Sequence, residues 1–182
     1  FLSQHIATLE TRQACDAFAR VIADFGRIYE VRPAAVACDG HPDYHSTQYA
    51  ERSGLPVIRV QHHYAHVLAA MAEHDLQGPV LGVAWDGTGD GMDGTVWGGE
   101  FLRVTDDGFR RSAALRAFPL PGGEQAVREP RRAAAGLLYP LYGDDLFSMV
   151  HLPPVADFSP LERRIVAQML ARGINSPLTS SA

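Results

Sequence analysis

The sequence predicts a mixed α/β fold with parallel strands, an antiparallel hairpin and flanking helices. Between residues 9 and 85, short apolar runs alternate with segments of helical periodicity, which is typical of strand–helix–strand units. After residue 95, two extended segments surround a turn at residues 106–108, which indicates a hairpin. The 182 residues are enough for one domain or two small lobes with a sizeable core.

The first part of the chain contains three predicted helices and three predicted strands. Apolar residues at three- and four-residue steps predict a helix over residues 9–29. Residues 34–38 read as a strand, and Asp43 can cap a helix that runs to about residue 52, where Gly54 is placed to end it. A strand at 56–60, a helix at 62–73 and a buried strand at 80–85 follow. This order predicts a layer of parallel strands.

The second part of the chain has a different pattern. Residues 95–104 and 110–118 are expected to be extended, and they form the hairpin. Residues 124–142 and 159–172 are expected to be helical. The stretch between these helices contains Pro153 and Pro154 and reads as a connector.

Composition and charge exclude several classes of protein. The net charge is −5 and all 16 basic residues are arginines, so a basic nucleic-acid-binding surface and a reactive lysine are not expected. No apolar run approaches the ~20 residues that cross a membrane, and no charged-then-apolar leader opens the chain. We therefore expect a cytoplasmic protein without a membrane partner. The start at Phe1, without an initiator methionine, suggests a piece of a longer protein.

The segment Gln61-His62-His63-Tyr64-Ala65-His66 contains the first candidate site. Residues four apart share one face of a helix, so His62 and His66 can bind one transition metal. Asp86 follows the next predicted strand, at the end where α/β sheets bind ligands. These three residues predict a two-histidine, one-carboxylate metal site with open coordination positions. The alternative is a pair of surface histidines.

A glycine-rich acidic segment follows this strand. Its glycines allow close approach of the backbone to phosphate, so Gly87, Thr88 and Gly89 are candidate nucleotide contacts. A calcium loop or a plain hairpin turn would have a similar composition, although the spacing does not fit an EF-hand.

Two further segments have both a functional and a structural interpretation. His41, at another predicted strand end, can contact a polar substrate or form part of a helix-entry turn with Pro42 and Asp43. Residues 121–132 contain several arginines that can face an anion or lie at a solvated helix start.

A series of motifs, in order along the whole chain, resembles the HypF family. The motifs are Phe1-Leu2-Ser3-Gln4-His5, His41-Pro42-Asp43-Tyr44, Val60-Gln61-His62-His63-Tyr64-Ala65-His66, Ala84-Trp85-Asp86-Gly87-Thr88-Gly89, Trp97-Gly98-Gly99-Glu100-Phe101, Pro119-Leu120-Pro121-Gly122-Gly123 and Ile174-Asn175-Ser176-Pro177-Leu178-Thr179-Ser180-Ser181-Ala182. Tyr64 departs from the pattern, where histidine is more usual.

The resemblance implies a lobe of the actin/sugar-kinase/Hsp70 (ribonuclease H-like) class. Residues 1–182 would be the first lobe of the carbamoyl-transfer domain, with a preceding hairpin and a second lobe absent. The family makes carbamoyl-adenylate from carbamoyl phosphate and ATP in a separate YrdC-like domain. The domain resembled here passes the carbamoyl group to the C-terminal cysteine of HypE, which leads to the cyanide ligands of nickel–iron hydrogenase.

The resemblance also implies roles for individual residues. The metal would be iron or zinc, bound by His62, His66 and Asp86 near the nucleotide phosphates. No general base is assigned, and the isolated piece is expected to be an inactive part of an ATP-dependent enzyme. One alternative is an O-carbamoyltransferase of natural-product biosynthesis. A second is a relative that modifies tRNA with threonylcarbamoyl, which the acidic balance and the absence of lysine disfavour. A third is a noncatalytic metal-binding interaction module.

Overall fold

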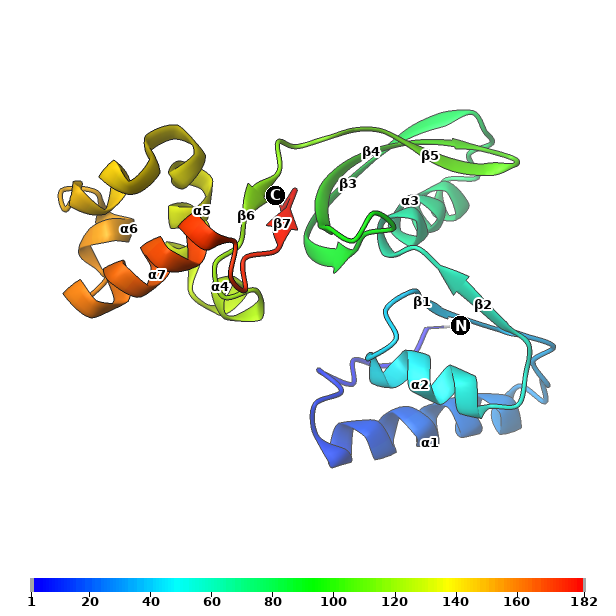
Figure 1. Cartoon of the computed structure of the whole chain (residues 1–182). Helices are drawn as coiled ribbons and strands as arrows, with labels where there is room; N and C mark the ends of the chain where they lie inside the picture. The colour runs from blue at the N-terminus through cyan, green and yellow to red at the C-terminus, as the bar shows by residue number, and fades with distance from the viewer. Residues whose placement is uncertain (1, 182) are drawn as a thin grey trace. The chain divides into compact units, whose positions relative to one another are not determined.

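The computed structural model describes residues 2–181, so the end residues of two motifs, Phe1 and Ala182, lie outside it. The chain divides into two compact units, Phe1–His62 and His63–Ala182. The boundary falls at the first residue of helix α3 (His62–Glu73). Figure 1 shows the elements of both units. No helix in the described part of the chain is long and apolar enough to cross a membrane.

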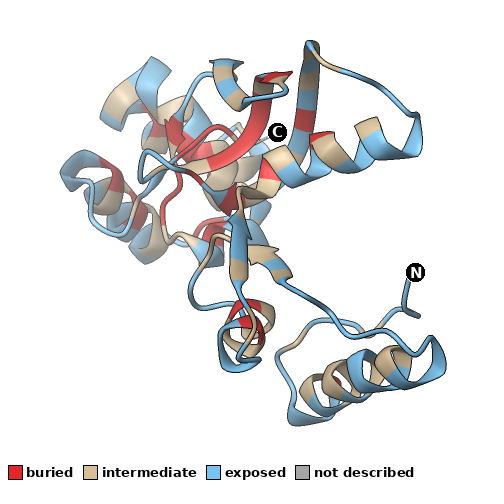
Figure 2. Ribbon diagram, turned by 90° about the vertical axis from the view of Figure 1, so that its right-hand side faces the viewer, coloured by how far each residue is buried: buried red, intermediate tan, exposed pale blue. Residues whose placement is uncertain are grey.

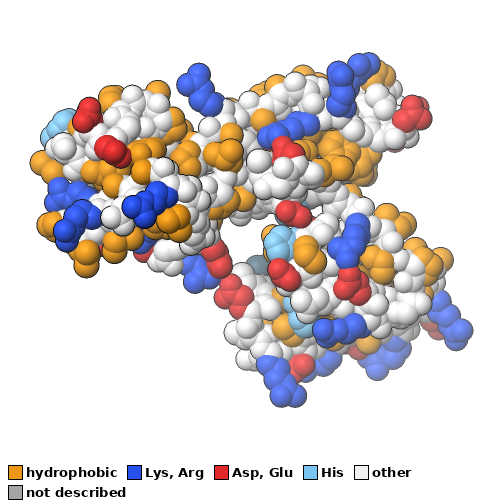
Figure 3. Space-filling view, viewed as in Figure 1, with side chains coloured by type: hydrophobic (Ala, Val, Ile, Leu, Met, Phe, Trp, Pro, Cys, Tyr) orange, Lys and Arg blue, Asp and Glu red, His pale blue; other side chains and the backbone are white. Residues whose placement is uncertain are grey.

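The first unit has two helices and a parallel strand pair. Helix α1 (Arg12–Ile28) begins later than predicted because the Thr11 side chain caps it, accepting from Ala14 N–H. Strands β1 (Val36–Asp39) and β2 (Val57–Val60) pair in parallel, with Asp39 opposite Val60. Acidic and basic side chains are interspersed on the face of this unit seen in Figure 3.

The expected cap of the second helix is wrong. Helix α2 (His45–Arg52) has Tyr44 at its N-cap position, without a side-chain cap hydrogen bond. Asp43 lies one residue earlier, and its N–H donates to His41 Nδ1 in the preceding turn. Gly54 does follow the helix with a positive φ of 74°, as expected for a residue that ends it.

The second unit is built on a five-stranded mixed sheet. Strand β4 lies in the middle, antiparallel to β3 and β5 and parallel to β7, and β7 pairs with β6. Most residues of β4 are buried. Figure 2 shows the buried residues in red. The strands are β3 (Val80–Asp90), β4 (Val96–Thr105), β5 (Gly108–Ala114), β6 (Phe118–Pro119) and β7 (Leu178–Thr179).

Strand β3 differs from the prediction in length and in partner. It continues to Asp90, past the expected end at residue 85, and it pairs antiparallel with β4 instead of extending the β1–β2 pair. The pairing shifts between Trp85 and Gly89, so the residues between them form a bulge. The glycines that read as a turn stay in the strand because β4 still supplies partners for Gly89 and Asp90.

Helix α3 packs closely against β3. A side chain at Gly82 would overlap both methyl groups of Val67, so glycine is needed for this approach. Gly82, Ala84 and Asp86 alternate along the strand with the exposed Leu81, Val83 and Trp85. The core beneath α3 contains Val67, Trp97, Leu102 and Val104.

Most of the remaining helices contribute to a separate core cluster, whereas Ala126 packs with Phe118 and Leu120 in another. The predicted helix 124–142 is interrupted at Glu129, because Pro130 cannot continue a helix but can start one. Val155, Phe158 and Val166 are buried at the centre of the cluster. The helices are α4 (Glu124–Arg128), α5 (Pro130–Tyr142), the 3-10 helix η1 (Gly143–Ser148), α6 (Pro153–Ala156) and α7 (Pro160–Arg172).

Candidate metal centre

Helix α3 carries both candidate histidine ligands. His62 is its first residue, and His66 follows after one turn on the same face. His63 is fully buried, with its ring 6.0 Å from that of Trp97, so it packs in the core.

Asp86 of β3 lies beside this helical face. His66 Nε2 is 3.6 Å from Asp86 Oδ2. One ligand atom each from His62, His66 and Asp86 lies within 4.8 Å of the other two. The structure therefore brings the three predicted residues together, although Asp86 lies at a strand bulge and not at a strand end.

The donor set suits a divalent transition metal. Two imidazoles and a carboxylate are ligands of zinc and of non-haem iron, and three protein ligands leave positions open. The side chains are partly accessible, with exposed fractions of 29% for His62, 59% for His66 and 28% for Asp86. The residues thus fit the metal implied by the sequence, and metal binding itself stays a prediction.

Asp39 is a neighbour of His62 that sequence reasoning missed. Its Oδ2 lies 2.7 Å from His62 Nδ1. Asp39 ends β1, and His62 follows shortly after the paired strand β2. A carboxylate at the end of one parallel strand and a histidine just beyond the next is the sequence signal that could have indicated this contact.

The candidate nucleotide contacts Gly87, Thr88 and Gly89 lie in the bulge of β3. The Gly87 N–H donates to Asp86 Oδ1 at 2.7 Å, so this amide is directed at the candidate ligand's own side chain. The Gly87 carbonyl accepts from Ser181 Oγ at 2.6 Å. Because the Gly87 N–H is already bonded to Asp86, it does not form part of an anion-binding nest. Nucleotide binding by Gly87, Thr88 and Gly89 stays a prediction.

A network of charged residues fixes the turn that follows. Asp93 accepts from Thr95 and from Trp97 Nε1, and its Oδ2 lies 2.8 Å from Arg111 Nη1. Burial raises the pKa of Asp93, but these hydrogen bonds and the charge of Arg111 outweigh it and lower the pKa to about 2. Asp93 therefore closes the turn between β3 and β4, a role for which the acidic glycine-rich sequence gave no distinct signal.

His41 has the contacts of a turn residue. Its N–H donates to Asp39 Oδ1 at 2.9 Å, its Nδ1 accepts from Asp43 N–H, and its ring stacks on Tyr44 with centroids 4.4 Å apart. This arrangement matches the helix-entry interpretation of the sequence. Contact of His41 with a polar substrate stays a prediction.

Residues 121–132 contain arginines that could face an anion, but Arg131 and Arg132 form ion pairs with nearby glutamates. Arg131 contacts Glu129 and Glu162, each at 2.9 Å, and Arg132 contacts Glu129 at 3.1 Å. These contacts favour the structural interpretation of the segment over an anion site.

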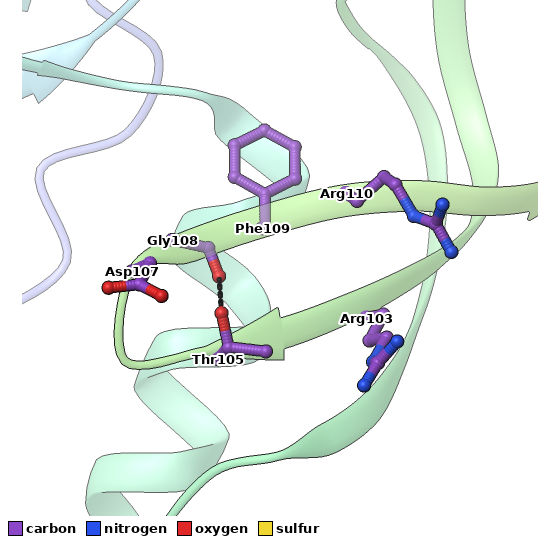
Figure 4. Close-up of a pocket in the computed structure, with 6 residues that line it drawn as sticks. All are labelled: Arg103, Thr105, Asp107, Gly108, Phe109 and Arg110. Carbon is purple, nitrogen blue, oxygen red and sulfur yellow. Dashed lines mark hydrogen bonds between the residues drawn. The ribbon is translucent and has the colours of Figure 1, made fainter.

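A separate hollow of about 350 Å³ lies at the β4–β5 turn (Figure 4). Arg103 and Arg110 are cross-strand partners and lie on one side of the hairpin, whereas Phe109 points to the other side. Phe109 stacks on Tyr64 of α3, with ring centroids 4.4 Å apart. None of the predicted site residues lines this hollow.

Two family models match the chain. Residues 1–73 match the HypF Kae1-like domain, and residues 82–182 match the second subdomain of the carbamoyltransferase Kae1-like domain. Together these matches include all the candidate ligands.

Curated relatives align over the whole chain. Carbamoyltransferase HypF of Synechocystis sp. is 44% identical over 195 residues, which cover 100% of this chain and 25% of the relative. Carbamoyltransferase HypF2 of Cupriavidus necator is 41% identical over 186 residues, which cover 100% of this chain and 22% of the relative. The chain thus spans about a quarter of the length of these relatives.

Solved structures confirm the predicted fold class. A full-length HypF in a phosphate- and nucleotide-bound form has a TM-score of 0.89 and 38% identity, and the match covers 100% of this chain and 23% of that one. HypF of T. kodakarensis has a TM-score of 0.87 and 34% identity, covering 99% and 25%. The chain therefore belongs to the HypF carbamoyltransferase family and matches the models of its Kae1-like domain.

Proposed function

We propose that this chain forms part of an ATP-dependent carbamoyltransferase. It would take part in the transfer of a carbamoyl group from carbamoyl-adenylate to the C-terminal cysteine of HypE, during cyanide-ligand synthesis for nickel–iron hydrogenase. Membership of the HypF family supports this reaction over an O-carbamoyltransferase. Carbamoyl phosphate and ATP would be the substrates of the longer protein, consistent with the nucleotide in the full-length HypF structure.

The observation that carries the proposal is the cluster of His62, His66 and Asp86 beside the bulge of β3. When bound there, iron or zinc would act as a Lewis acid toward the charge that develops on the carbonyl oxygen and the departing phosphate. The two imidazoles are held one helical turn apart by α3. The Gly87 N–H donates to Asp86 Oδ1 and leaves Oδ2 facing His66. We further propose that Gly87, Thr88 and Gly89 lie against the nucleotide.

The transfer exchanges one bond for another at the carbamoyl carbon. The thiolate sulfur of the HypE cysteine forms a C–S bond as the C–O bond to the phosphate of AMP breaks, and AMP leaves with both electrons. The thiol arrives ionised, with its proton released to solvent, so the step needs no general base from this chain. The chain's own residues serve to place and stabilise the reacting groups.

The test is Asp86→Ala in the full-length parent protein, with the two half-reactions measured separately. We expect carbamoylation of HypE to be lost and carbamoyl-adenylate formation to persist, because adenylate formation is assigned to the YrdC-like domain. Asp107→Ala, at an exposed carboxylate in the turn between β4 and β5, is the control and should retain both reactions. Loss of both half-reactions in Asp86→Ala would contradict the assignment.

A further inference from the structure

Asp39 uses its two carboxylate oxygens for two different partners. Oδ1 accepts the backbone N–H of His41 at 2.9 Å, and Oδ2 lies 2.7 Å from His62 Nδ1. The side chains of Asp39 and His62 are 16% and 29% exposed, so solvent competes little for the contact between them. All three residues lie in the first unit, where the parallel pairing of β1 and β2 sets their spacing.

This contact determines which ring nitrogen of His62 carries the proton. An ionised carboxylate only accepts hydrogen bonds, so Nδ1 must be the donor. In a neutral imidazole, Nε2 then keeps its lone pair and is the nitrogen that can bind a metal. Because the candidate ligand His62 needs one such nitrogen, the contact prepares it for coordination.

We propose that Asp39 is a positioning residue that holds His62 in the Nδ1–H tautomer and presents its Nε2 to the metal. The inference rests on the proposed metal centre and adds to it a fourth residue that would not touch the metal. Carboxylates that hold metal-binding histidines in this way typically change metal affinity by about 10- to 100-fold when they are replaced.

The geometry makes a specific prediction for Asp39→Asn. His41 N–H requires an acceptor, so the amide oxygen of the new side chain must face His41. Its NH₂ group then faces His62 Nδ1, which has to become an acceptor. The proton of His62 should therefore move to Nε2, where it blocks coordination.

His41 gives an internal reference in the same molecule. Its Nδ1 accepts from Asp43 N–H at 3.2 Å, so its proton lies on Nε2, opposite to that of His62. A nitrogen NMR spectrum of the imidazoles distinguishes the two tautomers directly. Unchanged His41 signals also report that the turn around Asp39 has kept its structure.

The experiment uses the metal-free 182-residue chain at about pH 8, where ordinary imidazoles are neutral. We expect the Nδ1–H form of His62 in the parent and the Nε2–H form in Asp39→Asn. Asp43→Asn changes a nearby exposed carboxylate and should leave His62 as in the parent.

A second measurement follows zinc binding to the same proteins by competition with a chelator. Affinity should fall about 10- to 100-fold in Asp39→Asn and remain unchanged in Asp43→Asn. An unchanged His62 tautomer in Asp39→Asn, or equal zinc affinity in the two variants, overturns the role of Asp39. Unchanged zinc affinity in His66→Ala instead overturns the metal centre, so the two failures can be told apart.

Discussion

Arg111 binds the buried carboxylate of Glu100 through two hydrogen bonds, Nε to Oε2 at 2.6 Å and Nη2 to Oε1 at 3.1 Å. Glu100 is completely buried in β4, and Arg111 approaches it from β5. Gly98 N–H and the Ser180 hydroxyl also donate to Oε1. The buried charge is therefore tolerated because four donors and one cation surround it.

Replacing Arg111 should destabilise the second unit strongly. In Arg111→Met, the Glu100 carboxylate would remain buried without its counter-charge, which typically costs about 3–5 kcal/mol of unfolding free energy. Urea unfolding of the 182-residue chain measures this loss.

Arg110→Met is the matched control for that experiment. Arg110 is exposed on the same strand and forms no ion pair within residues 2–181. Its replacement should change the unfolding free energy by less than ~0.5 kcal/mol. Similar losses of unfolding free energy in both variants would show that Arg111 is not needed to stabilise the buried Glu100 carboxylate.

Asp93 should make stability depend on pH in the acid range. Its folded-state pKa of about 2 lies below the ordinary value of 3.8, so the folded state holds the proton less tightly. The resulting stabilisation is complete above about pH 4 and is lost as the pH falls toward 2.

The measurement compares the parent with Asp93→Asn by urea unfolding at a series of pH values. The variant should be less stable at neutral pH, and the difference should shrink between about pH 4 and pH 2. A difference that stays constant across this range would mean that the charge of Asp93 is not responsible.

Gly82→Ala should disturb both stability and metal binding. The new methyl group would overlap the branched side chain of Val67, so helix α3 must shift away from β3. Overpacking of this kind typically costs about 1–3 kcal/mol, and the shift should also separate His66 from Asp86. Gly87→Ala is the stability control, because a methyl group there meets nothing within 4 Å. Equal unfolding free energies for the two variants would argue against a tight helix–strand contact.

His66→Ala should lower the content of divalent metal. Elemental analysis after equilibration with zinc should find less metal than in the parent, whereas His74→Ala, at an exposed histidine just after the same helix, should match the parent. Binding by the parent should weaken as the solution is acidified, because protons compete for imidazole nitrogens. Equal metal content in His66→Ala and the parent would remove this residue from the site.

The 182-residue chain alone should bind ATP weakly and should not transfer carbamoyl groups. The nucleotide-bound HypF structure is about four times as long, and well-formed pockets bury about 70–90% of their ligand. Losing two or three polar contacts, at roughly 1.4 kcal/mol per tenfold, weakens affinity by about a hundred- to a thousandfold. Isothermal titration tests this expectation, which a low-micromolar dissociation constant would contradict.

The sequence predicted features that depend on local periodicity. The four-residue spacing of His62 and His66 placed them on one helical face, and the apolar runs located β1 and β2. The break before Pro130 was missed, although the proline itself is a local signal for it, because the apolar periodicity continues on both sides.

The features that the sequence analysis missed depend on pairing between distant segments. The extension of β3 through Gly89 requires the partner residues of β4, which no local pattern around Gly87 indicates. The contact between Asp39 and His62 joins residues 23 positions apart and needs the parallel register of two strands. Likewise, nothing near Glu100 shows that it is buried, because its partner Arg111 comes from the next strand.

The pairing of β4 has a consequence for synthesis on the ribosome. Two segments pair with the same edge of β4. Strand β5 pairs with the later residues of β4, and Ser180 bonds to Gly99 nearer the start of β4. Glu100 and Ser180 are 80 residues apart, so at ~5–20 residues per second the early part of that edge stays unpaired for roughly 4–16 s. Unpaired strand edges invite association with other chains. The nascent protein therefore passes through an interval in which a chaperone that shields strand edges would improve its yield.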